Sequence, residues 1–219
     1  EGDRWGTNSE FIRIDHVRHV VETIDAIAAR NWNAFRSNPC GKNSNINEEA
    51  FYKTCELYNS LSGSYKDTLK IAAALHDYGR FSGAKNHYAE GAVKVGEELS
   101  LLGYPELLIN HVKLLIEHHA GPRNFSESQI TDLGKIGEDR GLLTALIILG
   151  ISDIHSSGDF ELTQKRIDKI LSLCGPVQAL GAVTTEAPSA TVSQRPTTPG
   201  IETIPEPGTE MVAQPISAG

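Results

Sequence analysis

The sequence lacks any apolar stretch of about 18 residues, the length at which a helix begins to span a lipid bilayer. Its first residues also lack the basic and then apolar segments of a secretory signal. Basic residues are in the minority, with 20 Lys and Arg against 28 Asp and Glu and a net charge of -8, which argues against a general affinity for nucleic-acid backbones. We therefore expect no membrane segment, no strong nucleic-acid binding and, provisionally, a cytoplasmic location.

Cysteine is scarce as well. Cys40, Cys55 and Cys174 are an odd number of residues without CxxC spacing. This pattern favours neither a disulfide framework nor a zinc knuckle, and it is typical of a protein in a reducing environment.

Helical periodicity dominates the first three quarters of the chain, and no alternating strand pattern competes with it. The expected helices span residues 11–30, 48–61, 66–75, 87–102, 105–119, 142–154 and 162–173, with a turn-rich loop over residues 37–47. No internal repeat is present. The sequence therefore predicts an all-α helical bundle in one domain over residues 1–174.

Residues 175–219 change composition to Pro, Thr, Ser, Ala and Glu, with almost no aromatic side chains. Such a segment buries too little apolar surface to offset the entropy lost on ordering. We expect a disordered tail or a linker. Because the chain starts with Glu1 rather than Met, we also expect it to be a fragment, with room for further domains beyond its termini.

Histidines and carboxylates gather in one part of the sequence, where six of the eight histidines lie between His76 and His155. Asp153 lies near the end of a stretch that is apolar almost all round, where an unpaired carboxylate costs several kcal/mol. It therefore needs a partner, a proton or a metal ion. The alternative is that the helix leaves the core here, because Ser152, His155 and Ser156 bring polarity back.

A second apolar stretch ends in His76 and Asp77, so an imidazole and a carboxylate arrive together at a helix end. Both groups are preferred ligands of divalent transition metals, and one Asp can bridge two ions through its two oxygens. The adjacent His118 and His119 diverge by about 100° on a helix and can reach different ions. Their alternative role is that of histidines favoured by the helix dipole at a C-terminus.

Helical phase distinguishes the two histidines of the first helix. His16 borders the apolar stripe, whereas His19 is expected on the opposite, solvated face. Asp15 is either a hydrogen-bond partner that orients an imidazole or a surface residue of a helix start. His111 lies two turns before His118, and we expect a surface imidazole there rather than a ligand.

The ordered series of these residues resembles the HD superfamily of metal-dependent phosphohydrolases, in its expanded version with extra histidines. The similarity covers about residues 12–172. It rests on the segments HVRHV at 16–20, ALHDYGR at 74–80, HYAEGA at 87–92 and IEHHAG at 116–121, followed by Asp153. The interval of 60 residues between His16 and His76 is long for the family and contains the 37–47 loop, which we interpret as an insertion or a lid.

The resemblance implies two divalent ions, Fe or Mn in the first place and otherwise Zn, Co or Ni. One ion would be held by His16, His76, Asp77 and Asp153, and the second by His87, His118, His119 and a bridging Asp77. Asp77 and Arg80 would be the catalytic residues. Arg80, Lys85 and Arg123 lie near these motifs and are candidates to contact the phosphate of the substrate, because cations must balance its developing charge. The alternative for each of the three is a solvated surface charge. A Gly-Tyr-Pro signature of the cyclic-dinucleotide branch does not follow the paired histidines, because the triplet at 103–105 lies upstream of them.

The function expected from this resemblance is hydrolysis of a phosphate ester or anhydride in a small nucleotide-like molecule, by a metal-activated water. Two other functions fit the same ligand set. One is a mixed-valent di-iron oxygenase of the same superfamily, and the other is a catalytically idle sensor or scaffold domain.

Overall fold

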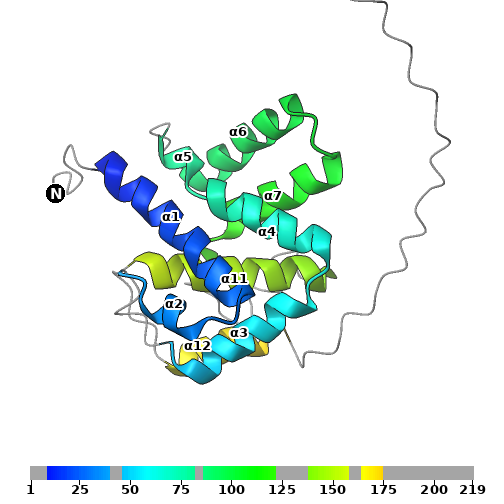
Figure 1. Cartoon of the computed structure of the whole chain (residues 1–219). Helices are drawn as coiled ribbons and strands as arrows, with labels where there is room; N and C mark the ends of the chain where they lie inside the picture. Colours follow the sequence, from blue (N-terminus) through cyan, green and yellow to red (C-terminus); the bar gives the residue numbers. More distant parts are fainter. Residues whose placement is uncertain (1–8, 40–45, 82–85, 122–137, 158–163, 175–219) are drawn as a thin grey trace, which may run out of the picture. The chain divides into compact units, whose positions relative to one another are not determined.

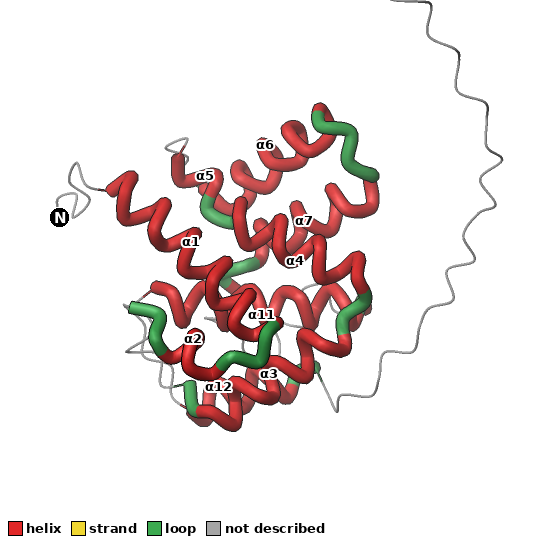
Figure 2. The backbone as a smooth tube through the Cα atoms, viewed as in Figure 1, coloured by secondary structure: helices red, strands yellow, loops and turns green. Residues whose placement is uncertain are grey.

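The computed structural model describes residues 9–39, 46–81, 86–121, 138–157 and 164–174. All regular elements in these ranges are α-helices: α1 Ser9–Ala28, α2 Trp32–Arg36, α3 Glu48–Ser60, α4 Gly63–Leu75, α5 Tyr78–Phe81, α6 His87–Leu101, α7 Glu106–His118, α11 Arg140–Ser157 and α12 Gln164–Ser172 (Figures 1 and 2). Within the described residues there is no strand, so the predicted all-α class is confirmed. Contacts between Cα atoms divide the chain into residues 1–183 and 184–219. The predicted tail, residues 175–219, lies outside the described residues.

Every helix predicted from periodicity is present, with ends displaced by a few residues. The sequence did not predict two short helices, α2 and α5, which have five and four residues. Neither is long enough to complete the apolar repeat by which amphipathic helices are recognised. Asn31 begins α2 by accepting a hydrogen bond from the Ala34 amide at 3.0 Å, a cap between the first predicted helix and the predicted 37–47 loop.

Helix α11 is the centre of the bundle, and residues 141–156 of this helix are all buried. It packs against α1, α3, α4 and α7, and Figure 1 shows α1 crossing it. Such a helix must be apolar on every side, which is why the stretch from Leu142 to Ile151 carries almost no polar side chain. At its start Asp139 accepts hydrogen bonds from the Leu142 amide at 2.9 Å and from the Tyr65 hydroxyl at 2.5 Å.

Two glycines allow α5 to lie directly on α6. A Cβ atom on Gly91 would lie 2.9 Å from the Gly79 amide nitrogen, and one on Gly79 would lie 2.0 Å from the His87 carbonyl oxygen. Any side chain at these positions would separate the helices. This close approach brings the segment that follows Asp77 to the first turn of α6, where His87 lies.

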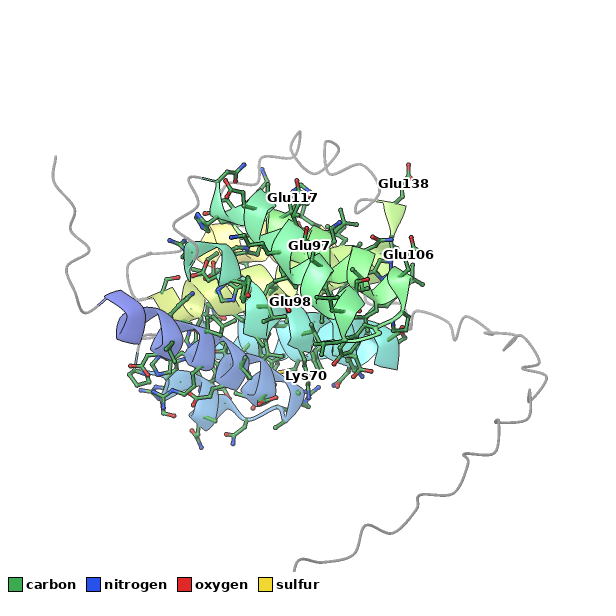
Figure 3. All side chains as sticks on the ribbon, turned by 90° about the horizontal axis from the view of Figure 1, so that it is seen from above. Lys70, Glu97, Glu98, Glu106, Glu117 and Glu138 are labelled. Atoms are coloured by element: carbon green, nitrogen blue, oxygen red, sulfur yellow. The ribbon has the colours of Figure 1, made fainter. Side chains whose placement is uncertain are left out.

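Many charged side chains of the described helices are exposed, whereas Asp77 and Asp153 are buried. The exposed residues labelled in Figure 3 are Lys70, Glu97, Glu98, Glu106, Glu117 and Glu138. Val95 and Leu99, on the opposite side of α6, are buried in the core. Among the described helices, none combines the length and the apolar character needed to cross a membrane.

Candidate metal centre

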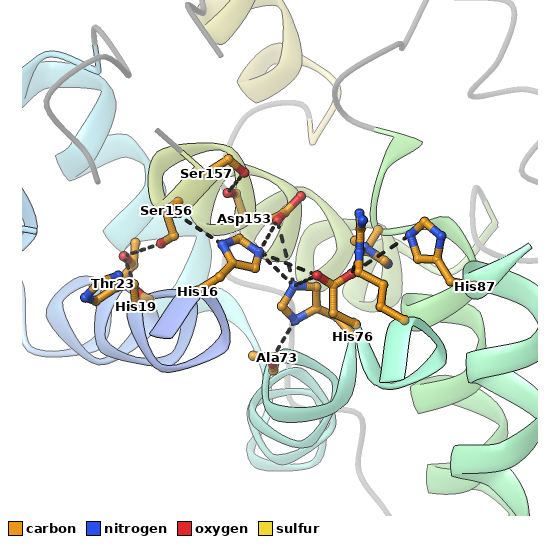
Figure 4. A network of polar contacts seen from close by, with 12 residues as sticks. His16, His19, Thr23, Ala73, His76, His87, Asp153, Ser156 and Ser157 are labelled. Carbon is orange, nitrogen blue, oxygen red and sulfur yellow. Dashed lines mark hydrogen bonds and ion pairs between the residues drawn. The ribbon is translucent and has the colours of Figure 1, made fainter. Parts of the chain in front are cut away.

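Four of the predicted ligands meet at one point between α1, the end of α4 and α11 (Figure 4). The Nε2 atom of His16 lies 3.2 Å from Nε2 of His76, 3.0 Å from Oδ1 of Asp153 and 3.9 Å from Oδ2 of Asp77. The Nε2 atom of His76 is 3.8 Å from the same oxygens of Asp77 and Asp153. Ligand atoms bound about 2.1 Å from one ion are separated by about 3 to 4 Å, so these spacings fit a shared cation.

The imidazoles of His16, His76 and His119 are each oriented by a backbone carbonyl. His16 donates its Nδ1 hydrogen to the carbonyl of Ser156 at 3.2 Å, and His76 donates to that of Ala73 at 2.8 Å. His119 does the same with the carbonyl of Ile116 at 2.7 Å. Since a carbonyl oxygen only accepts, the hydrogen of each neutral ring is on Nδ1. The Nε2 lone pair is then the group available for coordination.

The atoms that converge here are therefore all hydrogen-bond acceptors, namely two Nε2 lone pairs and two carboxylates. Acceptors at 3.0 to 3.9 Å repel one another unless a positive charge lies between them. A proton can supply part of that charge. Burial by itself lowers the pKa of His16, but the hydrogen bond and the negative charge of Asp153 outweigh burial and raise it. A divalent cation satisfies all four groups at once, so the residues present fit a metal ion.

The other oxygen of Asp77 faces a different set of groups. Its Oδ1 atom accepts a hydrogen bond from Nε of Arg80 at 2.6 Å, and it lies 3.7 Å from Nε2 of His119 and 4.0 Å from Nε2 of His87. Burial alone would raise the pKa of Asp77, but His76 and Arg80 outweigh it and hold the pKa below its usual range. Asp77 is thus negatively charged at neutral pH, and its Oδ1 atom is paired with the positive guanidinium of Arg80.

His119 is neutral at physiological pH. Burial, together with the nearby His76, lowers its pKa to about 4. A neutral imidazole with its hydrogen on Nδ1 presents a lone pair at Nε2, the form in which histidine binds metals. Among the residues that the structure describes, two groups have donor atoms close enough together to hold an ion: His16, His76 and Asp153, and His76, Asp77 and His119.

The last predicted ligand that the structure describes is His118. His118 is half-buried, and among the described residues no hydrogen bond, ion pair or ring contact joins it to the other ligands. Lys85 and Arg123 lie outside the described residues, so their predicted phosphate contacts stay predictions. The ring of His111 stacks on that of Tyr65 with 5.7 Å between centroids, and His111 belongs to neither group of candidate ligands.

Three expectations about individual residues are resolved. His19 was predicted to be solvated, and this is wrong: only 8% of it is exposed, because α2 and Asn38 cover this face of α1. Asp15 is a surface residue, paired with Arg18 at 3.0 Å. Helix α11 does not leave the core at Asp153, since Ser152 and Ser156 are as buried as their apolar neighbours.

Sequence reasoning missed the groups that hold His16 in place. The carbonyl that orients its ring belongs to Ser156, whose Oγ lies 3.2 Å from Oγ1 of Thr23 (Figure 4). Asn38 donates a hydrogen bond to Thr23 at 3.0 Å. The local sequence does not indicate that these polar side chains support His16, because their partners are more than 100 residues away or lie next to the unpredicted helix α2.

Comparisons with known proteins add no relative. No protein-family model matches this chain, and no curated protein matches it either.

Proposed function

We propose that this protein is a metal-dependent phosphohydrolase of the HD type, acting on a small phosphorylated molecule such as a nucleotide. One observation carries the proposal: the Nε2 atoms of His16 and His76 meet the carboxylates of Asp77 and Asp153 within 3.0 to 3.9 Å at a buried point. These residues come from α1, from the turn that follows α4 and from α11, in the order that the resemblance to the HD superfamily requires. The oxygenase and the idle domain considered from the sequence share this ligand set, and phosphate release distinguishes the proposed activity from both.

His16, His76, Asp77 and Asp153 would hold the ion. Imidazole nitrogen and carboxylate oxygen are donors that suit Fe, Mn, Zn, Co and Ni, rather than the all-oxygen sites typical of Mg and Ca. Such an ion, when bound, lowers the pKa of water toward neutrality and acts as a Lewis acid, which is what phosphate-ester hydrolysis at neutral pH needs. Net hydrolysis breaks one P–O bond, adds a water oxygen to phosphorus and transfers a proton to the leaving oxygen.

The side chains of the chain itself supply position and charge. Asp77 and Asp153 are buried, so their charges act in surroundings that screen them little. Arg80 is a fixed positive charge beside Asp77, and 35% of its side chain is exposed, so a bound anion can reach it. A guanidinium at this position balances the negative charge that develops on a phosphoryl group.

Phosphate release is the direct test. The purified chain is stripped of metal, reloaded separately with Mn²⁺, Fe²⁺, Co²⁺, Ni²⁺ or Zn²⁺, and assayed against nucleotides, dinucleotides and sugar phosphates. We expect release with at least one pair of metal and substrate, and a loss of about 100-fold or more in His76→Ala, which removes a ligand. The matched control is His111→Ala, which removes an imidazole away from the centre and retains activity. Equal turnover in both variants would reject the proposal.

A further inference from the structure

Arg80 lies against the same carboxylate that a second metal ion would need. Its Nε donates to Oδ1 of Asp77 at 2.6 Å, whereas Oδ2 of Asp77 faces His16 and His76. The two oxygens of Asp77 therefore have different neighbours: two imidazoles near Oδ2, and a guanidinium with two more distant imidazoles near Oδ1. A bridging Asp77, as the resemblance implies, would have to exchange that guanidinium for an ion.

His76 limits the number of ions in a second way. Both candidate groups found in the described part of the chain include it, one with His16 and Asp153 and the other with Asp77 and His119. Its Nδ1 hydrogen is used on the carbonyl of Ala73 at 2.8 Å, so it has a single lone pair to offer, on Nε2. One lone pair binds one ion. The two groups cannot both be filled at the same time, so a second ion would have to be held by Asp77, His87 and His119 without His76.

The charge of Arg80 is permanent. A guanidinium does not lose its proton in proteins, so Arg80 cannot become neutral in order to admit a dication, as a lysine or a histidine can. A dication coordinated to Oδ1 of Asp77 would lie next to this charge in a site where Asp77 is only 6% exposed and solvent screens little. Occupation of that side would require Arg80 to move away.

We propose that Arg80 takes the place of a second ion, so that the centre binds one divalent ion through His16, His76, Asp77 and Asp153. His87 and His119 then lie beside Oδ1 of Asp77 without holding a metal ion. This proposal rests on the metal centre proposed above and replaces the two-ion centre that the resemblance implies.

The test is the number of Mn²⁺ ions bound by the whole chain and by Arg80→Gln. Both proteins are equilibrated with excess Mn²⁺, freed of loose ions by rapid gel filtration and measured by elemental analysis. Electron paramagnetic resonance then distinguishes isolated Mn²⁺ from an exchange-coupled pair. We expect one isolated ion in the unaltered chain. In Arg80→Gln we expect two coupled ions, because Oδ1 of Asp77 becomes accessible between His87 and His119.

Two further variants sharpen the result. Arg36→Gln removes an exposed arginine of α2 and is expected to bind one ion, which separates a local effect from a change in net charge. Adding His119→Ala to Arg80→Gln should remove the second ion again, since it deletes a ligand of the opened site. Two ions in the unaltered chain, or one in Arg80→Gln, would overturn the proposal.

Phosphate release measured on the same samples keeps the two proposals distinguishable. A chain that binds one Mn²⁺ and hydrolyses none of the substrates contradicts the proposed reaction but leaves the single-ion centre intact. A chain that binds two ions and hydrolyses phosphate esters contradicts the single-ion centre and supports the proposed reaction.

Discussion

The Nε2 atoms of His16 and His76 lie 3.2 Å apart although both rings donate their Nδ1 hydrogens to backbone carbonyls. Two lone pairs at this distance repel each other, and the neighbouring carboxylates of Asp77 and Asp153 add further acceptors. The folded chain thus concentrates negative potential at one buried point. The metal binding that we expect of this protein follows from this negative potential.

Metal binding should stabilise the fold, because the cation replaces repulsion by coordination. At a free Mn²⁺ concentration about 100 times the Kd, binding adds about 2.7 kcal/mol to the free energy of unfolding. For a chain of this size that corresponds to a rise in Tm of about 5 to 10 °C. Thermal unfolding followed by circular dichroism with Mn²⁺ and with EDTA measures it. His16→Ala should lose the rise and His111→Ala should keep it; an equal rise in both would contradict a centre at His16.

The paired histidines should behave differently. His119 is buried with its lone pair 3.7 Å from Asp77, whereas His118 is half-buried and makes no described contact with the centre. We expect His118→Ala to bind Mn²⁺ like the unaltered chain and to lose less than about 1 kcal/mol of stability, as surface substitutions do. His119→Ala leaves a buried cavity and should lose about 2 kcal/mol or more. Titration calorimetry measures Mn²⁺ binding and urea unfolding measures stability in the two variants. If His118→Ala loses a bound ion, His118 is a metal ligand, as the resemblance implies.

The contact between α5 and α6 depends on the absence of a side chain at Gly91. A Cβ atom there would lie 2.9 Å from the backbone nitrogen of Gly79, so Gly91→Ala must displace one helix. We expect a loss of about 1 to 3 kcal/mol in the free energy of unfolding, measured in urea. The control is Gly63→Ala in the first turn of α4, where a Cβ meets nothing within 4 Å. That variant should be neutral or stabilised by up to about 1 kcal/mol, since alanine favours helix.

Stability at alkaline pH should depend on Cys55. Burial raises the pKa of this thiol to about 11 from the value of 9.0 that it has when unfolded, so the folded chain holds its proton more tightly. The stabilising contribution is fully present below pH 9.0 and is lost as the pH rises through about 11. Urea unfolding at a series of pH values should therefore show a shallower alkaline decline in Cys55→Ala than in the unaltered chain. Ser60→Ala, which removes no titratable group, should keep the original slope, and identical slopes in all three proteins would refute the effect.

The helices were predictable where the chain repeats an apolar pattern over several turns. Helix α11 is the clearest case, because a run that is apolar on all sides has to be buried on all sides. The short α2 and α5 were not predictable, since five and four residues complete no repeat. The prediction for His19 failed for the same reason, because the structure that buries it includes α2 and Asn38.

The sequence by itself determined the all-α class, the long helices and the residue types able to hold a metal, because these depend on local periodicity and on side-chain chemistry. Only the tertiary structure decided which imidazoles meet, which nitrogen of each ring is available, and that Arg80 occupies one oxygen of Asp77. Such relations depend on distances between helices that are far apart along the chain. Periodicity states which face of a helix is buried, but not which atom of another helix lies opposite.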